Sequence, residues 1–108
     1  MTNFLDIEKT SIPYRQNVRI ENETFGFTIN YNEEGNFFTI DLYRGNELLV
    51  TGEKLVYGKS LFSTYADTRF PKAAIIPGDL TQQSEEVTWE TLGESVFLFI
   101  ITEADFNV

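Results

Sequence analysis

The side chains of this chain that could do chemistry are mainly carboxylates, because its 108 residues include 17 Asp and Glu but no His and no Cys. Acid–base catalysis near neutral pH, thiolate nucleophiles and most zinc or iron sites depend on His or Cys, so these chemistries lose their usual residues. Two acids at a fixed separation could still hydrolyse a glycoside. The acids that could form such a pair are Glu33 with Glu34, Glu85 with Glu86, and Glu103 with Asp105.

These three acid pairs fall in predicted turns, in a predicted loop or near the C-terminus, where acidic side chains are ordinary solvated residues. Clustered carboxylate and amide oxygens could also bind Ca²⁺, but the chain has no EF-hand spacing and no repeat. We therefore predict that the protein is not an enzyme and that it holds no cofactor and no metal ion.

The single tryptophan, Trp89 in the segment VTWETL, is the other candidate binding residue. Its ring could stack on a sugar, and with a sheet aromatic such as Tyr43 it would then form a small β-module that binds a carbohydrate or another small ligand. More often a lone tryptophan in a loop anchors that loop on a sheet or lies in a protein interface. The sequence leaves both interpretations open.

The charged residues are unevenly distributed along the chain, and they limit its partners. The net charge is −9: residues 1–43 hold 3 basic and 7 acidic residues, residues 44–72 hold 5 and 3, and residues 73–108 hold none and 7. Such a field repels phosphate groups, so we expect no nucleic-acid site and no contact with an anionic membrane. The acidic last third either serves solubility or faces a basic partner surface or an acidic channel.

Length and composition indicate one domain. A chain of this length with 42% hydrophobic and 15% aromatic residues can bury a core without a metal ion or a disulfide. Its start, MTNFLDIEKTS, lacks the regions of a signal peptide, and no apolar run is long enough to cross a membrane. We expect a protein made in the cytoplasm, with an N-terminal arm over residues 1–12 and a single β-domain over residues 13–108.

The elements that must position these residues are β-strands. Phe25, Phe27 and Ile29 share one face of a segment whose other face carries Thr24 and Thr28, which is the two-residue period of a half-buried strand. About six or seven strands joined by short turns predict an all-β fold, either a compact antiparallel β-barrel or a two-sheet sandwich, with an extended N-terminal arm. The predicted strands cover residues 14–21, 24–31, 36–44, 47–56, 73–76 and 95–102, and one more could form near 86–90.

Five glycines are expected where the backbone needs their conformational freedom. Gly35 and Gly45 lie in hairpin turns, where a left-handed residue is common. Gly52 interrupts a predicted strand, which suggests a bulge, and Gly58 begins a segment that we expect to form a short helical turn or an ordered loop. Gly78 belongs to a Pro-Gly-Asp sequence, which predicts a turn after the short strand at 73–76.

The last predicted strand differs from the others because its sequence, SVFLFIIT, is apolar from Val96 to Ile101. A run of this kind is too short to cross a membrane. It is typical of a central strand that is buried on both faces.

Apolar residues outside the regular strands are candidate interface residues. For the N-terminal arm two interpretations are open: a tail that binds a partner, or an edge strand packed on its own domain. The candidates lie in the arm and the residue that follows it, in the segment 57–70 and in the last third of the chain: Phe4, Ile12, Tyr14, Tyr57, Leu61, Phe62, Tyr65, Phe70, Trp89 and Phe106.

Several sequence motifs follow one another over residues 12–106. An Ile12-Pro13 step leads into a hairpin with Phe25 and Phe27, and a polar turn with an aromatic strand follows in NEEGNFFTIDLYR. Then come LLVTGEKLVYGKSLFSTY, PGDL and a closing SVFLFIITEADF. In this order the motifs resemble the baseplate plug family of contractile-tailed bacteriophages and phage-derived tail particles.

This resemblance implies a structural role. It implies a small β-domain in the tail baseplate of a virion, seated at the centre, where it plugs or lines the axial channel beside hub, tube and spike proteins. It suggests no catalysis and no cofactor, and it leaves open whether several copies assemble together.

Overall fold

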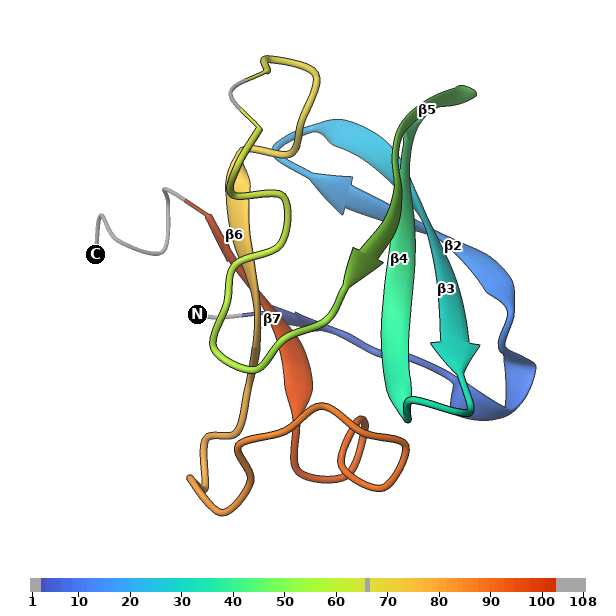
Figure 1. Cartoon of the computed structure of the whole chain (residues 1–108). Helices are drawn as coiled ribbons and strands as arrows, with labels where there is room; N and C mark the ends of the chain where they lie inside the picture. The colour runs from blue at the N-terminus through green and yellow to red at the C-terminus, as the bar shows by residue number, and fades with distance from the viewer. Residues whose placement is uncertain (1–2, 66, 103–108) are drawn as a thin grey trace.

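The computed structural model describes residues 3–65 and 67–102 and forms a sandwich of two antiparallel sheets (Figure 1). Because the sheets do not close into a barrel, the predicted all-β fold is confirmed in its sandwich form. A 3₁₀ turn, η1 (Lys9–Ser11), lies between β1 and β2. One sheet has the order β2 (Tyr14–Ile20), β3 (Glu23–Asn32), β4 (Phe37–Arg44), β5 (Glu47–Lys54), and the other has the order β1 (Asn3–Leu5), β7 (Phe97–Thr102), β6 (Ala73–Gly78).

The core lies between the two sheets and is built from alternate residues of the strands. The predicted apolar face of β3 is confirmed, since Phe25, Phe27 and Ile29 are all buried. Burial of an apolar side chain of this size contributes roughly 1.5–3 kcal/mol, so the shared core holds the two sheets together. The residues that meet this face of β3 in the core cluster include Phe38, Ile40 and Leu42 of β4 and Ile75 and Leu98 of the other sheet.

The described part of the N-terminal arm contributes a strand to the smaller sheet. β1 pairs antiparallel with β7, from Asn3 opposite Ile100 to Leu5 opposite Leu98. Leu5 and the following Ile7 are buried in the core. Residues 3–5 of the arm therefore form an edge strand that packs on its own domain, which is one of the two interpretations given above.

The hairpin turns use left-handed residues, though not always the glycines. Glu21 and Asn22 both have positive φ, 50° and 66°, between β2 and β3, which is the pattern of a type I′ turn. In the turn between β3 and β4 the left-handed residue is Asn36, with φ 53°, which corrects the expectation for Gly35. Asn tolerates this conformation better than most residues because its short side chain can hydrogen-bond locally. Gly45 has φ 62°, as predicted for the turn between β4 and β5.

The pairing of β4 with β5 shifts at a bulge opposite Asp41. Gly52 has φ 74° there, as expected for a glycine that interrupts a strand, although its position is exposed. The Asp41 carboxylate accepts hydrogen bonds from the Gly52 N–H (2.8 Å) and from the Thr51 hydroxyl (3.0 Å). This side chain thus replaces the backbone partner that the bulge removes.

β6 continues through Pro77 and Gly78, where the sequence predicted a turn. Pairing with β7 extends to Gly78 opposite Phe97, and the chain turns only from Asp79 onward. The Pro77 carbonyl accepts a hydrogen bond from the Gly58 N–H (2.8 Å), so this residue directs its backbone groups away from β7. Because the backbone groups of Pro77 point away from β7, the N–H that proline lacks would not have bonded to β7. Proline is therefore tolerated at this position of the strand.

The described residues of the connection between β5 and β6, 55–65 and 67–72, form a loop that covers the outer edge of β6 (Figure 1). Besides the Gly58 bond, the Leu61 N–H donates to the Ile75 carbonyl (2.8 Å). Leu61 and Phe62 lie in the core. The long segment 79–96 is likewise a loop, and no strand forms at 86–90 within the described residues.

Candidate interaction surface

The outer face of the four-stranded sheet is mostly polar, although Tyr43 and Leu48 lie opposite each other on it. Arg15 and Arg19 of β2 lie opposite Thr28 and Thr24 of β3. Because Phe25, Phe27 and Ile29, which flank these threonines along β3, are buried in the core, the two arginines point away from it. On β4, Asp41 belongs to the same face. This alternation is typical of a sheet with one face on the core and the other in water.

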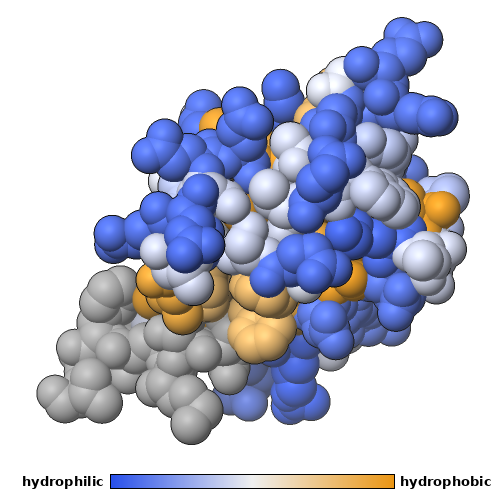
Figure 2. All heavy atoms as spheres, turned by 90° about the horizontal axis from the view of Figure 1, so that it is seen from below, coloured by the Kyte–Doolittle hydropathy of each residue, from blue (hydrophilic) through white to orange (hydrophobic). Residues whose placement is uncertain are grey.

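The outer face of the three-stranded sheet is apolar instead. Its outward residues include Phe4 on β1, Ile76 on β6 and Phe99 on β7, which lie side by side in the register of the sheet. A groove of about 770 Å³ runs over this face, and Leu80, 83% exposed, lies at its edge. Figure 2, a view of the molecule from below, shows orange areas set in a surface that is mostly blue. We call this the outer apolar face, defined by Phe4, Ile76, Leu80, Phe97, Phe99 and Ile101.

Three phenylalanine rings form the centre of the outer apolar face. Phe4 lies 5.0 Å from Phe97 and 6.4 Å from Phe99, and the last two lie 6.5 Å apart, measured between ring centroids. All three pairs are edge-to-face, an arrangement that aromatic rings favour. Phe4 is nevertheless 50% exposed. The rings therefore hold one another in place while they remain accessible.

β7 corrects the expectation that the last strand is buried on both faces. It is the central strand of its sheet, and Val96, Leu98 and Ile100 are buried. Phe97 and Phe99, however, point to the outside and are only partly covered. The apolar sequence thus produces a strand with two apolar faces. Within the described residues, only the face toward the core is buried.

The predicted interface residues lie in different environments. Phe4 belongs to the outer apolar face, and Tyr65 is exposed, with its ring stacked on Phe70 at 4.9 Å. Phe106 lies outside the described residues. Leu61, Phe62 and Phe70 are buried in the core, and Ile12, Tyr14, Tyr57 and Trp89 are half-buried.

Most of the outer apolar face was not predicted from the sequence. Ile76, Leu80, Phe97, Phe99 and Ile101 were not among the predicted interface residues. The available signal was the unbroken apolar run of β7, which was interpreted as burial within the chain.

Trp89 anchors the loop 79–96 on the four-stranded sheet. Its ring stacks on Phe38 (6.1 Å) and packs against Tyr31 (4.9 Å), while the Lys9 ammonium lies 5.4 Å from its centre. Lys9 also donates a hydrogen bond to the Trp89 carbonyl (2.6 Å). A cavity of about 530 Å³ adjoins this residue, but the ring is already engaged by its own chain. These contacts favour the loop-anchor interpretation over a stacking platform for a sugar.

Asp79 is a buried carboxylate that organises the start of the same loop, beside the outer apolar face. It accepts hydrogen bonds from the backbone N–H groups of Thr81 (2.8 Å), Gln83 (3.1 Å) and Ser84 (2.9 Å) and from the Thr81 hydroxyl. The hydroxyl bond from Thr81, together with these backbone N–H groups, lowers the pKa of Asp79 although burial opposes the charge. The carboxylate is thus occupied by its own loop.

The acid pairs considered for catalysis do not converge in the described structure. Glu33 and Glu34 lie in the β3–β4 turn, Glu85 and Glu86 are exposed in the loop 79–96, and Glu103 and Asp105 lie outside the described residues. Over residues 3–65 and 67–102, no group of three Asp or Glu side chains is arranged to hold a metal ion. The same residues include no helix long and apolar enough to span a membrane.

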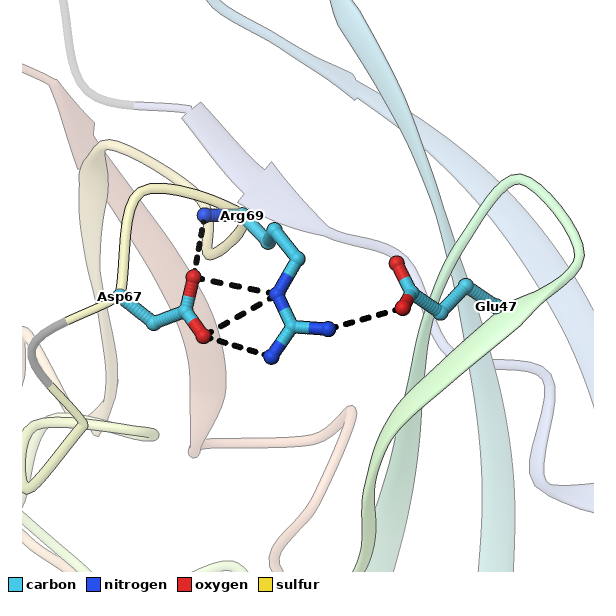
Figure 3. A network of polar contacts seen from close by, with 3 residues as sticks. All are labelled: Glu47, Asp67 and Arg69. Atoms are coloured by element: carbon cyan, nitrogen blue, oxygen red, sulfur yellow. Dashed lines mark hydrogen bonds and ion pairs between the residues drawn. The ribbon is translucent and has the colours of Figure 1, made fainter.

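An ion-pair network fixes the loop 55–72 to the four-stranded sheet (Figure 3). The Arg69 guanidinium bonds both carboxylate oxygens of Asp67 and also contacts Glu47 at the start of β5 (2.8 Å). The hydrogen bonds from Arg69 lower the pKa of Asp67 to about 2. One guanidinium therefore links the loop that covers β6 to the edge strand of the opposite sheet.

Comparison with known proteins identifies the family of this fold. The sequence profile of the family described as cyanophage baseplate Pam3 plug gp18 matches residues 3–103. A search among curated proteins found no match. The match covers every strand of both sheets, and it assigns the chain as a structural component of a phage tail baseplate that interacts with other baseplate proteins. The chain therefore belongs to the baseplate plug family, as its motifs predicted.

Proposed function

We propose that this protein sits at the centre of the tail baseplate and plugs or lines the axial channel through contacts with hub, tube or spike proteins. The observation that carries the proposal is the outer apolar face of the three-stranded sheet, together with the family match. A soluble monomer rarely leaves a contiguous apolar surface of this kind uncovered, and such surfaces mark interaction sites. The protein acts by occupying a place in an assembly.

Partial exposure of the aromatic residues supports this role. Burying an aromatic side chain against a partner contributes roughly 1.5–3 kcal/mol, and interface energy is usually concentrated in a few such residues. Phe4, Phe97 and Phe99 offer a compact group of this type. Tyr65, exposed on the loop 55–72, is a second contact candidate on a different element.

The charge of the chain fits a position beside a channel that passes DNA. A net charge of −9 repels the phosphate backbone, so a channel lined by this protein would not retain DNA. The protein needs no cofactor for this role and performs no catalysis. It is made in the cytoplasm of the bacterial host and incorporated into the virion tail during assembly.

The proposal is tested by mixing the purified 108-residue chain with the hub, tube and spike proteins of the same particle, singly and together, and separating complexes by size-exclusion chromatography. We expect co-elution with at least one of them, and density for the chain on the axis of the baseplate in electron microscopy of the particle. Absence of any complex, combined with stabilisation by a carbohydrate, would overturn the proposal in favour of a ligand-binding module.

A further inference from the structure

The charge of this protein is unevenly distributed along its sequence. Residues 1–8 and 73–108, which contain all three strands of the smaller sheet, hold nine Asp and Glu and no Lys or Arg. Residues 9–72, which contain the four-stranded sheet, hold eight acidic and eight basic residues. The two sequence segments that contain the strands of the outer apolar face thus account for the whole net charge of −9.

The immediate surroundings of the outer apolar face follow the same pattern. Among the described residues that line its groove, the charged ones are Asp79 and Glu94, and none is basic. Asp79 is buried and bound by its own loop, whereas Glu94 is exposed. The face therefore combines an aromatic centre with one exposed carboxylate, Glu94, at its edge.

We propose that the outer apolar face docks a different protein whose contact surface is apolar at its centre and carries Lys or Arg at its edge. This proposal rests on the proposed function, because it names the chemistry of the baseplate partner. The aromatic centre supplies affinity, and the complementary charges supply a fast and correctly oriented encounter.

A second copy of this chain does not fit the face. Two such faces brought together would place the Glu94 carboxylates of both copies in one interface. Like charges in an interface are unfavourable. The C-terminal segment that follows Thr102 does not fit either, since its charged residues are Glu103 and Asp105. Charge complementarity thus selects a basic partner.

The first experiment uses two synthetic peptides with the same apolar strand sequence, one flanked by Lys and the other by Glu. Each is titrated into the full ¹⁵N-labelled chain while amide shifts are recorded. We expect the Lys peptide to shift signals of β1, β6 and β7, and the Glu peptide to leave them unchanged. If the Lys peptide shifts no signal of these strands, or if both peptides act equally, the inference is overturned whatever the baseplate proteins do.

The second experiment measures the affinity for the baseplate protein that co-elutes with the chain. Phe99→Ser and the more exposed Phe4→Ser should each weaken binding by about tenfold or more, whereas Tyr43→Ser on the polar face should change it by less than about twofold. Thermal melting verifies that each variant is folded. Unchanged binding by both Phe variants would overturn the inference and leave the proposed function intact, because the partner would then use another surface.

Charge variants test the edge of the face. Glu94→Lys should lower the association rate by about threefold or more, and Glu21→Lys in the β2–β3 turn should not. Added salt, from about 0.05 M to about 0.5 M, should weaken wild-type binding. Salt-independent binding would overturn the basic-partner assignment. So would self-association that Phe4→Ser abolishes, or tighter binding after removal of residues 103–108.

Discussion

At the scale of single residues, carboxylates in this protein act on its own backbone and its own loops. Asp79 illustrates this, because its two oxygens receive three backbone N–H groups and one hydroxyl from the five residues that follow it. A charged acceptor strengthens such bonds, and removing it leaves several donors without a partner.

We expect Asp79→Ala to lower Tm by several degrees at pH 7, and Asp79→Asn to lower it less, since the amide oxygen still accepts. Because the pKa of Asp79 is lowered in the folded state, its contribution to stability is present above the ordinary Asp pKa and is lost as the pH falls through the folded-state pKa. Melting curves of wild type and Asp79→Ala should therefore converge in acid. Glu85→Gln in the same loop is the control and should melt like the wild type at pH 7.

Arg69 sets the titration of Asp67. We expect carbon-13 NMR of the Asp67 carboxyl to give a pKa of about 2 in the wild type and a value near the ordinary one, about 3.9, in Arg69→Gln. The lowered pKa means that this pair stabilises the fold above the ordinary pKa and loses that effect as the pH falls toward about 2. Arg19→Gln, a distant change of the same type, should leave the titration unchanged. An ordinary pKa in the wild type would mean that the pair does not persist in solution.

At the scale of elements, a glycine contributes to stability where its φ is positive, and a glycine with an ordinary φ can be replaced at little cost. Gly52→Ala in the β5 bulge and Gly58→Ala in the loop 55–72 should each cost about 1 kcal/mol, because both residues have φ above 70°. Gly78 lies in β6 without positive φ, and a methyl group there would lie 3.6 Å from the Phe99 ring, an ordinary contact. Urea unfolding should show Gly78→Ala within about 0.5 kcal/mol of wild type. Similar losses at all three positions would contradict the assigned backbone.

The two faces of β7 give a direct test of what the free chain buries. Leu98 points into the core and is fully buried, and Leu98→Ala should cost about 2–5 kcal/mol. Phe99→Ala, on the adjacent outward residue, should cost distinctly less although it removes more atoms, because its ring is already partly in water. Equal losses in urea unfolding would indicate that the outer apolar face is covered in the isolated protein.

The strands themselves were predictable because each carries its own signal. Alternation specified β2, β3 and β4 to within a residue or two, and the Gly45-Asn46 turn specified the hairpin that follows. The end of β6 was not predictable, because proline in a sequence usually indicates a turn. Only the structure shows that the backbone groups of Pro77 face the loop 55–72 and not β7. Local sequence does not encode which side of a strand will lie at an edge.

At the scale of the whole molecule, acidic residues outnumber basic ones by nine. Self-repulsion among carboxylates without basic neighbours lowers stability, and salt relieves it. We expect Tm to rise with added NaCl, and Glu85→Lys in the acidic loop 79–96 to raise stability by up to about 0.5 kcal/mol at low salt. Glu21→Lys, in the segment 9–72 with its equal numbers of acidic and basic residues, is the matched control and should have a smaller effect. Calorimetric melting at low and high salt checks both, and a Tm that falls with salt would contradict the picture.

The sequence alone determined the all-β class, most strand positions, the family and the excess of acid, because alternation, turn residues, motif order and composition are properties of the chain itself. Only the tertiary structure decided that β1 joins β7 and that Phe97 and Phe99 face outward. The physical reason is that an apolar strand specifies two faces that avoid water, but not what covers them. Within the described chain the core covers one face, and we propose that a partner in the baseplate covers the other.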